Sequence, residues 1–157
     1  MMLIKKYMSF REKFEAAKQC KISLPENILD NDIVGVYGFF ANKEDSEDIC
    51  FYIGKATNIR NRLLLSGGHV YRYLHEDNSW FVPKLIKEYI ENGYEIEVRI
   101  LKEVNYKDEY FSRAAHRLAF EELKYITEYQ KKGQCLMQKP EGVGENEEAY
   151  WNKKYKK

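Results

Sequence analysis

The sequence predicts a mixed α/β (α+β) fold in which a small central three-stranded antiparallel sheet is flanked by helices. Two runs of strand-forming residues, 33–40 and 49–53, are joined by a short acidic loop, which favours an antiparallel hairpin. Apolar residues alternate with charged residues over 95–100, as in a half-exposed third strand. Strand alternation places Tyr52 on the same face as Cys50 and Gly54.

Apolar residues at helical spacing predict the helical segments that surround this sheet. In chain order, these segments cover about residues 1–22, 57–65, 70–74, 79–92 and 108–132. Thr57 is the expected N-cap of the second segment, and Asn78 or Ser79 is the expected N-cap of the fourth. Gly93 and Gly133 are expected to end the last two segments.

The composition indicates one folded domain with short appendages. Of the 157 residues, 44% are hydrophobic and 15% are aromatic, which argues against a disordered chain. The three cysteines lie far apart, and neither a Cys-x-x-Cys pair nor zinc spacing occurs, so reduced thiols are expected. No apolar run is long enough for a signal peptide or a membrane span. We expect an N-terminal accessory helix over 1–30, the core domain over 31–139 and a C-terminal tail over 140–157.

One stretch of the chain is locally basic although the formal net charge is only +1. Between Asp48 and Glu76 there is no acidic residue, as a surface that faces phosphate would require. The basic residues of this stretch are Lys55, Arg60, Arg62 and Arg72. Lys55 follows a predicted strand, and the arginines at 60 and 62 lie at the start of a predicted helix. This arrangement is typical of a phosphate-binding site.

One carboxylate, that of Glu122, lies on the apolar face of the longest predicted helix. An unpaired buried charge is costly, so this carboxylate needs a partner. A structural ion pair with a core arginine is one interpretation, and a metal ligand or an acid–base group is the other. The buried stripe around it is expected to comprise Phe111, Ala114, Ala115, Leu118, Ala119, Tyr125, Ile126 and Tyr129.

Two tripeptides on the predicted hairpin resemble the motifs of a known family. Gly35-Val36-Tyr37 and Tyr52-Ile53-Gly54 lie one hairpin apart, and Lys55 follows the second directly. Arg62 comes ten residues after Tyr52, and Glu122 has apolar residues at its third and fourth following positions. In these features about residues 32–138 resemble the GIY-YIG endonuclease family, and in particular the N-terminal nuclease domain of the bacterial excision-repair incision subunit. The resemblance implies a GIY-YIG nuclease-like fold and a metal-dependent DNA endonuclease that hydrolyses phosphodiester bonds.

The resemblance implies a role for each of five side chains. Tyr37 would act as the general base or orient the attacking water, and Tyr52 would position the water or the phosphate. A free tyrosine has a pKa of about 10, so a base role requires nearby cations or a metal to favour the phenolate. Lys55 would lower that pKa or bind phosphate, and Arg62 would bind the scissile phosphate. Glu122 would hold one Mg²⁺ or Mn²⁺, with waters and a substrate phosphate completing its shell.

Two positions depart from the family pattern. Members usually have an asparagine shortly after the helix that carries the glutamate, and residues 131–138 contain none. Gln134 or Gln138 offers the same amide group. Some members have a histidine four residues after the arginine, where this chain has Ser66, and the nearest histidine is His69. The expected DNA contacts are Lys55, Arg60, Arg62, His69 and Arg72.

The leading hypothesis is therefore a cytoplasmic, nucleoid-associated endonuclease that binds DNA and no membrane. Repair, restriction, recombination and mobile-element nucleases all fit the pattern, with a homodimer or a partner protein supplying specificity. The missing asparagine motivates an alternative, a catalytically silent nucleic-acid-binding module on the same fold. A structural or partner-binding α/β protein with an accidental motif match is a third. The N-terminal helix is expected to cover the core, and dimer formation or DNA contact is its alternative role.

Overall fold

Short runs of β-branched and aromatic residues pair into one mixed sheet. A computed structural model describes this sheet and the helices around it over residues 8–156. Three antiparallel strands form its body: β2 (Gly35–Asn42), β3 (Ile49–Ala56) and β4 (Glu95–Glu103). The strand β1 (Ile22–Ser23) pairs in parallel with β4, and the order across the sheet is β1-β4-β2-β3. The predicted α+β class and its three antiparallel strands are therefore confirmed, but the sheet has a fourth strand that was not predicted, because a strand as short as β1 shows no alternating pattern in the sequence.

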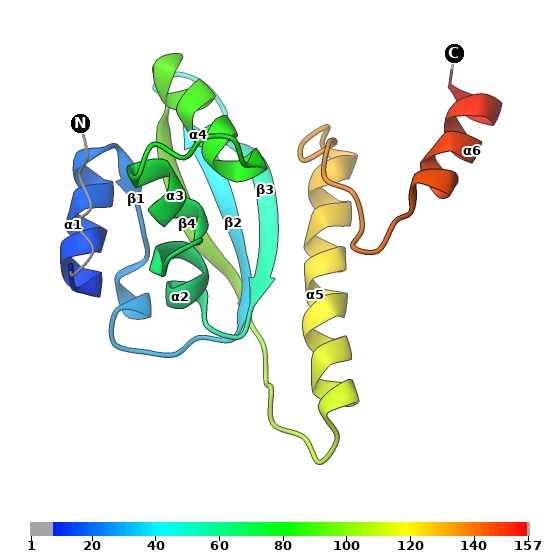
Figure 1. The fold of residues 1–157 in the computed structure, drawn as a ribbon, viewed down its shortest axis with the longest axis horizontal. Helices are drawn as coiled ribbons and strands as arrows, with labels where there is room; N and C mark the ends of the chain where they lie inside the picture. Colours follow the sequence, from blue (N-terminus) through cyan, green and yellow to red (C-terminus); the bar gives the residue numbers. More distant parts are fainter. Residues whose placement is uncertain (1–7, 157) are drawn as a thin grey trace.

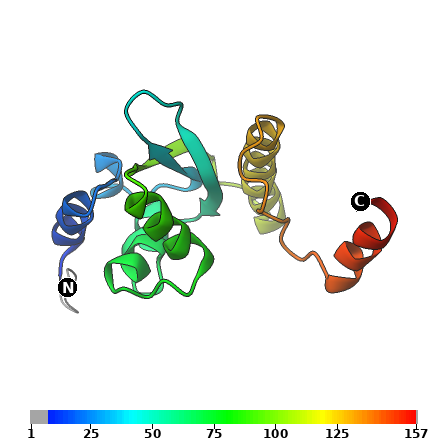
Figure 2. The ribbon, with the colours of Figure 1, turned by 90° about the horizontal axis from the view of Figure 1, so that it is seen from above.

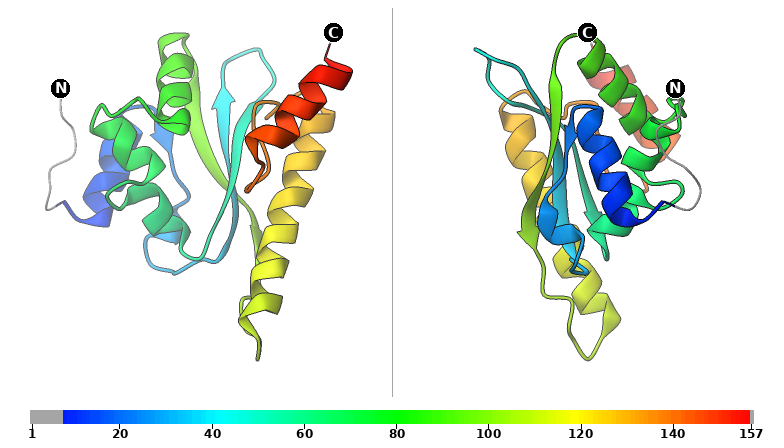
Figure 3. Two further views of the ribbon diagram at one scale, coloured as in Figure 1. Left: turned by 45° about the vertical axis from the view of Figure 1, so that its right-hand side comes forward. Right: turned by 90° about the vertical axis from the view of Figure 1, so that its left-hand side faces the viewer.

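The helices cover the two faces of this sheet in separate layers (Figures 1 and 2). One layer consists of α1 (Phe10–Gln19), α2 (Ile59–Leu64), α3 (His69–Leu74) and α4 (Phe81–Glu91). The 3₁₀ helix η1 (Glu26–Ile28) lies between β1 and β2 in the chain, and Ile28 is buried in the same core. On the other face lies α5 (Phe111–Lys131), whose Leu118 packs in a second core with Val36 and Phe40. Figure 3 shows the sheet between these two layers.

The first helix is shorter than the prediction of 1–22. It begins after Ser9, whose side chain accepts a hydrogen bond from the Glu12 N–H while the Glu12 carboxylate accepts one from the Ser9 N–H. It ends at Gln19, and Lys21 then takes a left-handed φ of 66° before β1. Residues 1–7 of the predicted helix lie outside the described residues.

Two predicted N-caps are wrong by one or two residues. Asn58 rather than Thr57 caps α2, because its side chain accepts the Asn61 N–H. Trp80 takes the N-cap position of α4, beyond both predicted caps, and its side chain forms no capping hydrogen bond. Neither correction moves a predicted site residue out of its element.

A bulge in β3 turns two neighbouring aromatic side chains to one face of the sheet. Phe39 pairs with Tyr52, whereas Phe40 pairs with Cys50, so Phe51 is the extra residue. Phe51 and Tyr52 therefore both face the layer of α1 to α4, and Cys50 faces α5. The predicted common face of Cys50 and Tyr52 is wrong because the bulge interrupts the alternation between them.

The side of α5 nearest the end of β3 is open to solvent. Ala114 and Leu118 are buried as predicted, but Ala119 is exposed and Phe111 is 75% exposed. Over the sheet itself, the Tyr125 hydroxyl donates to the Leu101 carbonyl at 3.0 Å. The predicted buried stripe is therefore wrong at Phe111 and Ala119, which line the clefts described below.

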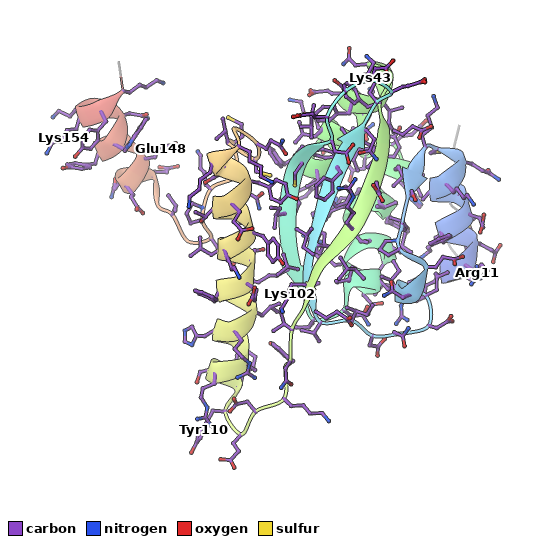
Figure 4. The ribbon with its side chains drawn as sticks, turned by 180° about the vertical axis from the view of Figure 1, so that it is seen from behind. Arg11, Lys43, Lys102, Tyr110, Glu148 and Lys154 are labelled. Atoms are coloured by element: carbon purple, nitrogen blue, oxygen red, sulfur yellow. The ribbon has the colours of Figure 1, made fainter. Side chains whose placement is uncertain are left out.

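The predicted C-terminal tail contains a helix, α6 (Glu145–Tyr155), that stands apart from the sheet beyond α5 (Figures 1 and 4). Its first turn is acidic and its last turn is basic, which suits the helix dipole. Figure 4 labels one residue of each kind, Glu148 and Lys154. Within residues 8–156, every helix is too short or too polar to cross a bilayer.

Candidate active site

Tyr37 lies at the centre of the candidate site, fully buried on β2. In the register of the sheet it pairs with Gly54 on β3, and its ring lies against the place where a side chain of residue 54 would be. A Cβ atom on Gly54 would come within 2.4 Å of the Tyr37 hydroxyl oxygen and 2.5 Å of the ring carbon that bears it. Glycine is therefore required at position 54 if the Tyr37 ring is to lie against the backbone of β3.

The Tyr37 hydroxyl lies 3.2 Å from Nε2 of His69, the first residue of α3. His69 is only 8% exposed, and burial together with the charges of Arg62 and Arg72 lowers its pKa to about 3. The imidazole is therefore neutral at pH 7, and one of its nitrogens accepts while the other donates. His69 was expected to contact DNA, and the structure instead places it behind Tyr37, inside the site.

Burial sets the protonation state of the two tyrosines. It raises the pKa of Tyr37, the nearby Tyr52 adds to this, and the charge and hydrogen bond of Arg62 oppose it. Burial likewise raises the pKa of Tyr52, again against the charge of Arg62. Arg62 thus acts on Tyr37 in the expected direction, but desolvation outweighs it. Both side chains are neutral phenols at neutral pH.

The other predicted site residues line two adjoining clefts beside α5. The larger cleft has a volume of about 780 Å³, and Lys55 and Arg62 are in its wall. The smaller has a volume of about 450 Å³, and Tyr52, Lys55 and Glu122 are in its wall. Lys55 lines both clefts and therefore marks the place where they meet. Side chains from β3, α2 and α5 converge there, as the motif spacing predicts.

The carboxylate of Glu122 lies where its charge is disfavoured. Burial raises its pKa, the positive charge of Lys55 opposes this, and the negative charge of Glu141 adds to it. No core arginine is among the groups that shift this pKa, so the structural ion pair considered above is not the arrangement in residues 8–156. A carboxylate whose pKa is raised in the wall of a cleft is typical of a functional site.

Arg60 and Arg72 are engaged in local structure outside the clefts. The Arg60 guanidinium forms an ion pair with Asp32 at 2.9 Å and lies over the Phe10 ring. The Arg72 guanidinium forms an ion pair with Asp77 at 2.8 Å and lies over an indole ring. Of the five expected DNA contacts, the structure therefore brings only Lys55 and Arg62 to the clefts.

The two glutamines considered as substitutes for an asparagine bind the outer edge of β3. The Cys50 N–H donates to Oε1 of Gln134 at 2.7 Å, and the Ile53 N–H donates to Oε1 of Gln138 at 3.0 Å. The Gln138 side-chain amide also donates to the Ile53 carbonyl. Because β3 is at the edge of the sheet, these bonds satisfy backbone groups that would otherwise be open for pairing with another chain. Gln138 also lines the smaller cleft.

Comparison with protein-family models, with curated proteins and with solved structures found no match for this chain.

Residues 8–156 contain no group of three or more histidine, cysteine, aspartate and glutamate side chains arranged to hold a metal ion. Mg²⁺, however, is usually bound by one or two carboxylates, several waters and substrate phosphates rather than by an all-protein cage. The Glu122 carboxylate, with Glu141 nearby and an open cleft in front of it, fits that mode of binding.

Glu141 is a site residue that sequence reasoning missed. Its carboxylate accepts from the Lys55 ammonium at 3.2 Å and 3.4 Å, and it lines both clefts. The sequence carries no signal for this contact, because Glu141 is one of several glutamates in the segment expected to be a C-terminal tail.

Proposed function

We propose that the protein is a metal-dependent endonuclease that hydrolyses DNA phosphodiester bonds on a GIY-YIG-like fold. One observation supports the proposal above the others. A tyrosine, a lysine, an arginine and a glutamate that match the family motif line the two adjoining clefts, although the chain separates the glutamate widely from the rest. The second tyrosine, Tyr37, lies buried where the charges of Arg62 and Glu122 act on its hydroxyl. An accidental match of short motifs does not require such convergence.

In this proposal the substrate phosphate binds between Lys55 and Arg62. The Arg62 side chain is exposed at the wall of the larger cleft, and its planar guanidinium suits two oxygens of one phosphate. Arg62 also counters negative charge that develops on the phosphoryl oxygens during hydrolysis. Glu122 would hold Mg²⁺ or Mn²⁺, which would supply Lewis-acid catalysis when bound.

Tyr37 acts as a neutral hydrogen-bonding group in this proposal. Its raised pKa argues against a phenolate in the free protein. Because Tyr37 is fully buried and lines neither cleft, we assign it the positioning of Arg62 rather than direct contact with the attacking water. The hydrogen bond to neutral His69 fixes the direction of the phenol. Tyr52, whose ring centroid lies 6.5 Å from that of Tyr37, positions the water or the phosphate.

The test is a cleavage assay on duplex, branched and single-stranded DNA with Mg²⁺ or Mn²⁺. Glu122→Gln and Arg62→Gln should each reduce the cleavage rate by roughly 100-fold or more, with circular dichroism unchanged. The matched controls are Glu121→Gln, next to Glu122 but outside both clefts, and Arg11→Gln on α1 (Figure 4). Failure to cut any of these substrates, or a Glu122→Gln variant that cuts at the wild-type rate, would contradict the proposal.

A second candidate function is a catalytically silent DNA-binding module on the same fold. The observation that favours it is the engagement of Gln138 with both backbone groups of Ile53, which leaves this amide less free to contact a substrate. This candidate predicts DNA binding that weakens as salt is added, without metal-dependent cleavage.

A further inference from the structure

The smaller cleft has an apolar wall that the proposed phosphate chemistry does not use. Phe81, Leu123 and Met137 line it and remain 46%, 55% and 76% exposed. Ile126 is half-buried beside them, and the Tyr52 ring lies 6.3 Å from the Phe81 ring, centroid to centroid. Large apolar side chains that gather in a concave, exposed site are typical of a binding site.

This apolar wall is continuous with the cation-bearing junction of the two clefts. Lys55, Ala119 and Glu141 line both clefts, so a ligand with its anionic group at Lys55 also lies beside the apolar wall. The occupant must therefore join an anion to a flat apolar group. Nucleotides have this combination of groups, and aromatic side chains beside a basic groove are the usual platform for unpaired bases.

We propose that the smaller cleft receives an unpaired nucleobase next to the scissile phosphate, and that the substrates are DNA strands with unstacked nucleotides rather than continuous duplex. This inference rests on the proposed function. In a duplex the bases are stacked inside and only the phosphates reach a protein surface. A base enters a side cleft beside its own phosphate only if it leaves the stack, which is easiest for a mismatched or single-stranded base.

The test compares three labelled DNAs of one sequence: a single strand, a continuous duplex, and a duplex with one unpaired nucleotide in the middle. Binding to the full chain is measured by fluorescence anisotropy in EDTA, and cleavage is measured with Mg²⁺. We expect the single strand and the interrupted duplex to bind about tenfold more tightly than the continuous duplex. With 2-aminopurine at the unpaired position, stacking in the cleft should quench its fluorescence.

Two cleft variants and a matched control test the assignment to this cleft. Phe81→Ala should weaken binding to unpaired DNA by roughly 5- to 160-fold and leave duplex binding unchanged. Leu123→Ala, which changes α5 instead of α4, should act in the same direction if Phe81→Ala proves unstable. Phe120→Ala is the control, because Phe120 is 64% exposed on α5 but lines neither cleft.

Several outcomes would overturn the inference and leave the proposed function standing. The first is cleavage of paired and unpaired DNA at equal rates. The second is an equal loss of binding to duplex and to unpaired DNA in Phe81→Ala. The third is a dimer, detected by sedimentation, that Phe81→Ala dissociates. The last outcome would show that a second copy of the chain covers the apolar wall. Absence of binding and cleavage with every DNA would instead refute the proposed function itself.

Discussion

The Glu141 carboxylate occupies the position that the proposed function gives to a substrate phosphate. It lies 3.2 Å from the Lys55 ammonium, and the two side chains are 78% and 27% exposed, respectively. An ion pair this exposed stabilises the protein by only about 0.2–1 kcal/mol. DNA must break the pair before a phosphate reaches Lys55, so Glu141→Gln should bind DNA more tightly by about 1.4- to 5-fold.

The salt dependence of binding gives a second, independent measure of the same effect. In the wild type, Glu141 already neutralises Lys55, so a phosphate that replaces it releases little counterion. In Glu141→Gln the lysine is free, and the slope of log K against log salt concentration should become steeper by up to about 0.9. Fluorescence anisotropy over a series of salt concentrations measures both the affinity and the slope.

Glu145→Gln is the matched control for this prediction. Glu145 is exposed at the start of α6, in the same C-terminal segment, and lines neither cleft. Its neutralisation removes the same charge from the protein without freeing Lys55. Equal effects of the two substitutions would refute the reasoning, because the gain would then come from net charge alone. Weaker DNA binding by Glu141→Gln would also refute it, and would indicate that Glu141 holds the metal together with Glu122.

Four further predictions concern the protein without DNA. Because the pKa of His69 is lowered to about 3, its neutral form favours the folded state, and stability is lost as the pH falls from about 6.5 toward 3. At pH 5 this loss is about 2 kcal/mol, and urea unfolding of His69→Gln should show a flatter pH dependence. Because the pKa of Glu122 is raised, its negative charge disfavours the folded state. Glu122→Gln should therefore be more stable than the wild type at pH 7 and no more stable below pH 4. Equal urea midpoints of the two proteins at pH 7 would contradict this. Gln138→Leu should cost about 1–3 kcal/mol in thermal or urea unfolding, since it leaves backbone groups of β3 without partners. Gly54→Ala should displace the Tyr37 ring, change the near-ultraviolet circular dichroism and cost about 1–3 kcal/mol of stability.

The residues that sequence reasoning placed correctly are those whose position depends on local pattern. Tyr37 and Tyr52 lie on paired strands because a short loop permits only a hairpin, and Glu122 lines the smaller cleft because helical spacing fixes its side of α5. The errors arise where tertiary contacts decide. The pairing of β1 with β4 depends on two segments far apart in the chain, and neither segment has a sequence pattern that predicts it.

The protonation states of Tyr37 and His69 could not be predicted from the sequence either. Spacing alone shows that cations lie near Tyr37, which favours a phenolate. Burial, which depends on every layer of the fold, outweighs those cations and keeps the phenol neutral. The same holds for His69, which follows a glycine turn in the sequence and looks exposed there, yet becomes the buried partner of Tyr37.

The features that the clefts combine are each unfavourable for folding, and this supports the view that they serve a ligand. A half-buried carboxylate is held at a raised pKa, and Phe81 and Met137 remain exposed in a concave wall. By contrast, Arg60 and Arg72 outside the clefts are paired, and the edge of β3 is covered by two glutamine side chains. Local conflicts with stability that gather in one place, in a fold that is otherwise consistent, are expected at a functional site. A ligand that brings a metal ion to Glu122, an anion to Lys55 and a base to Phe81 would resolve all of them together.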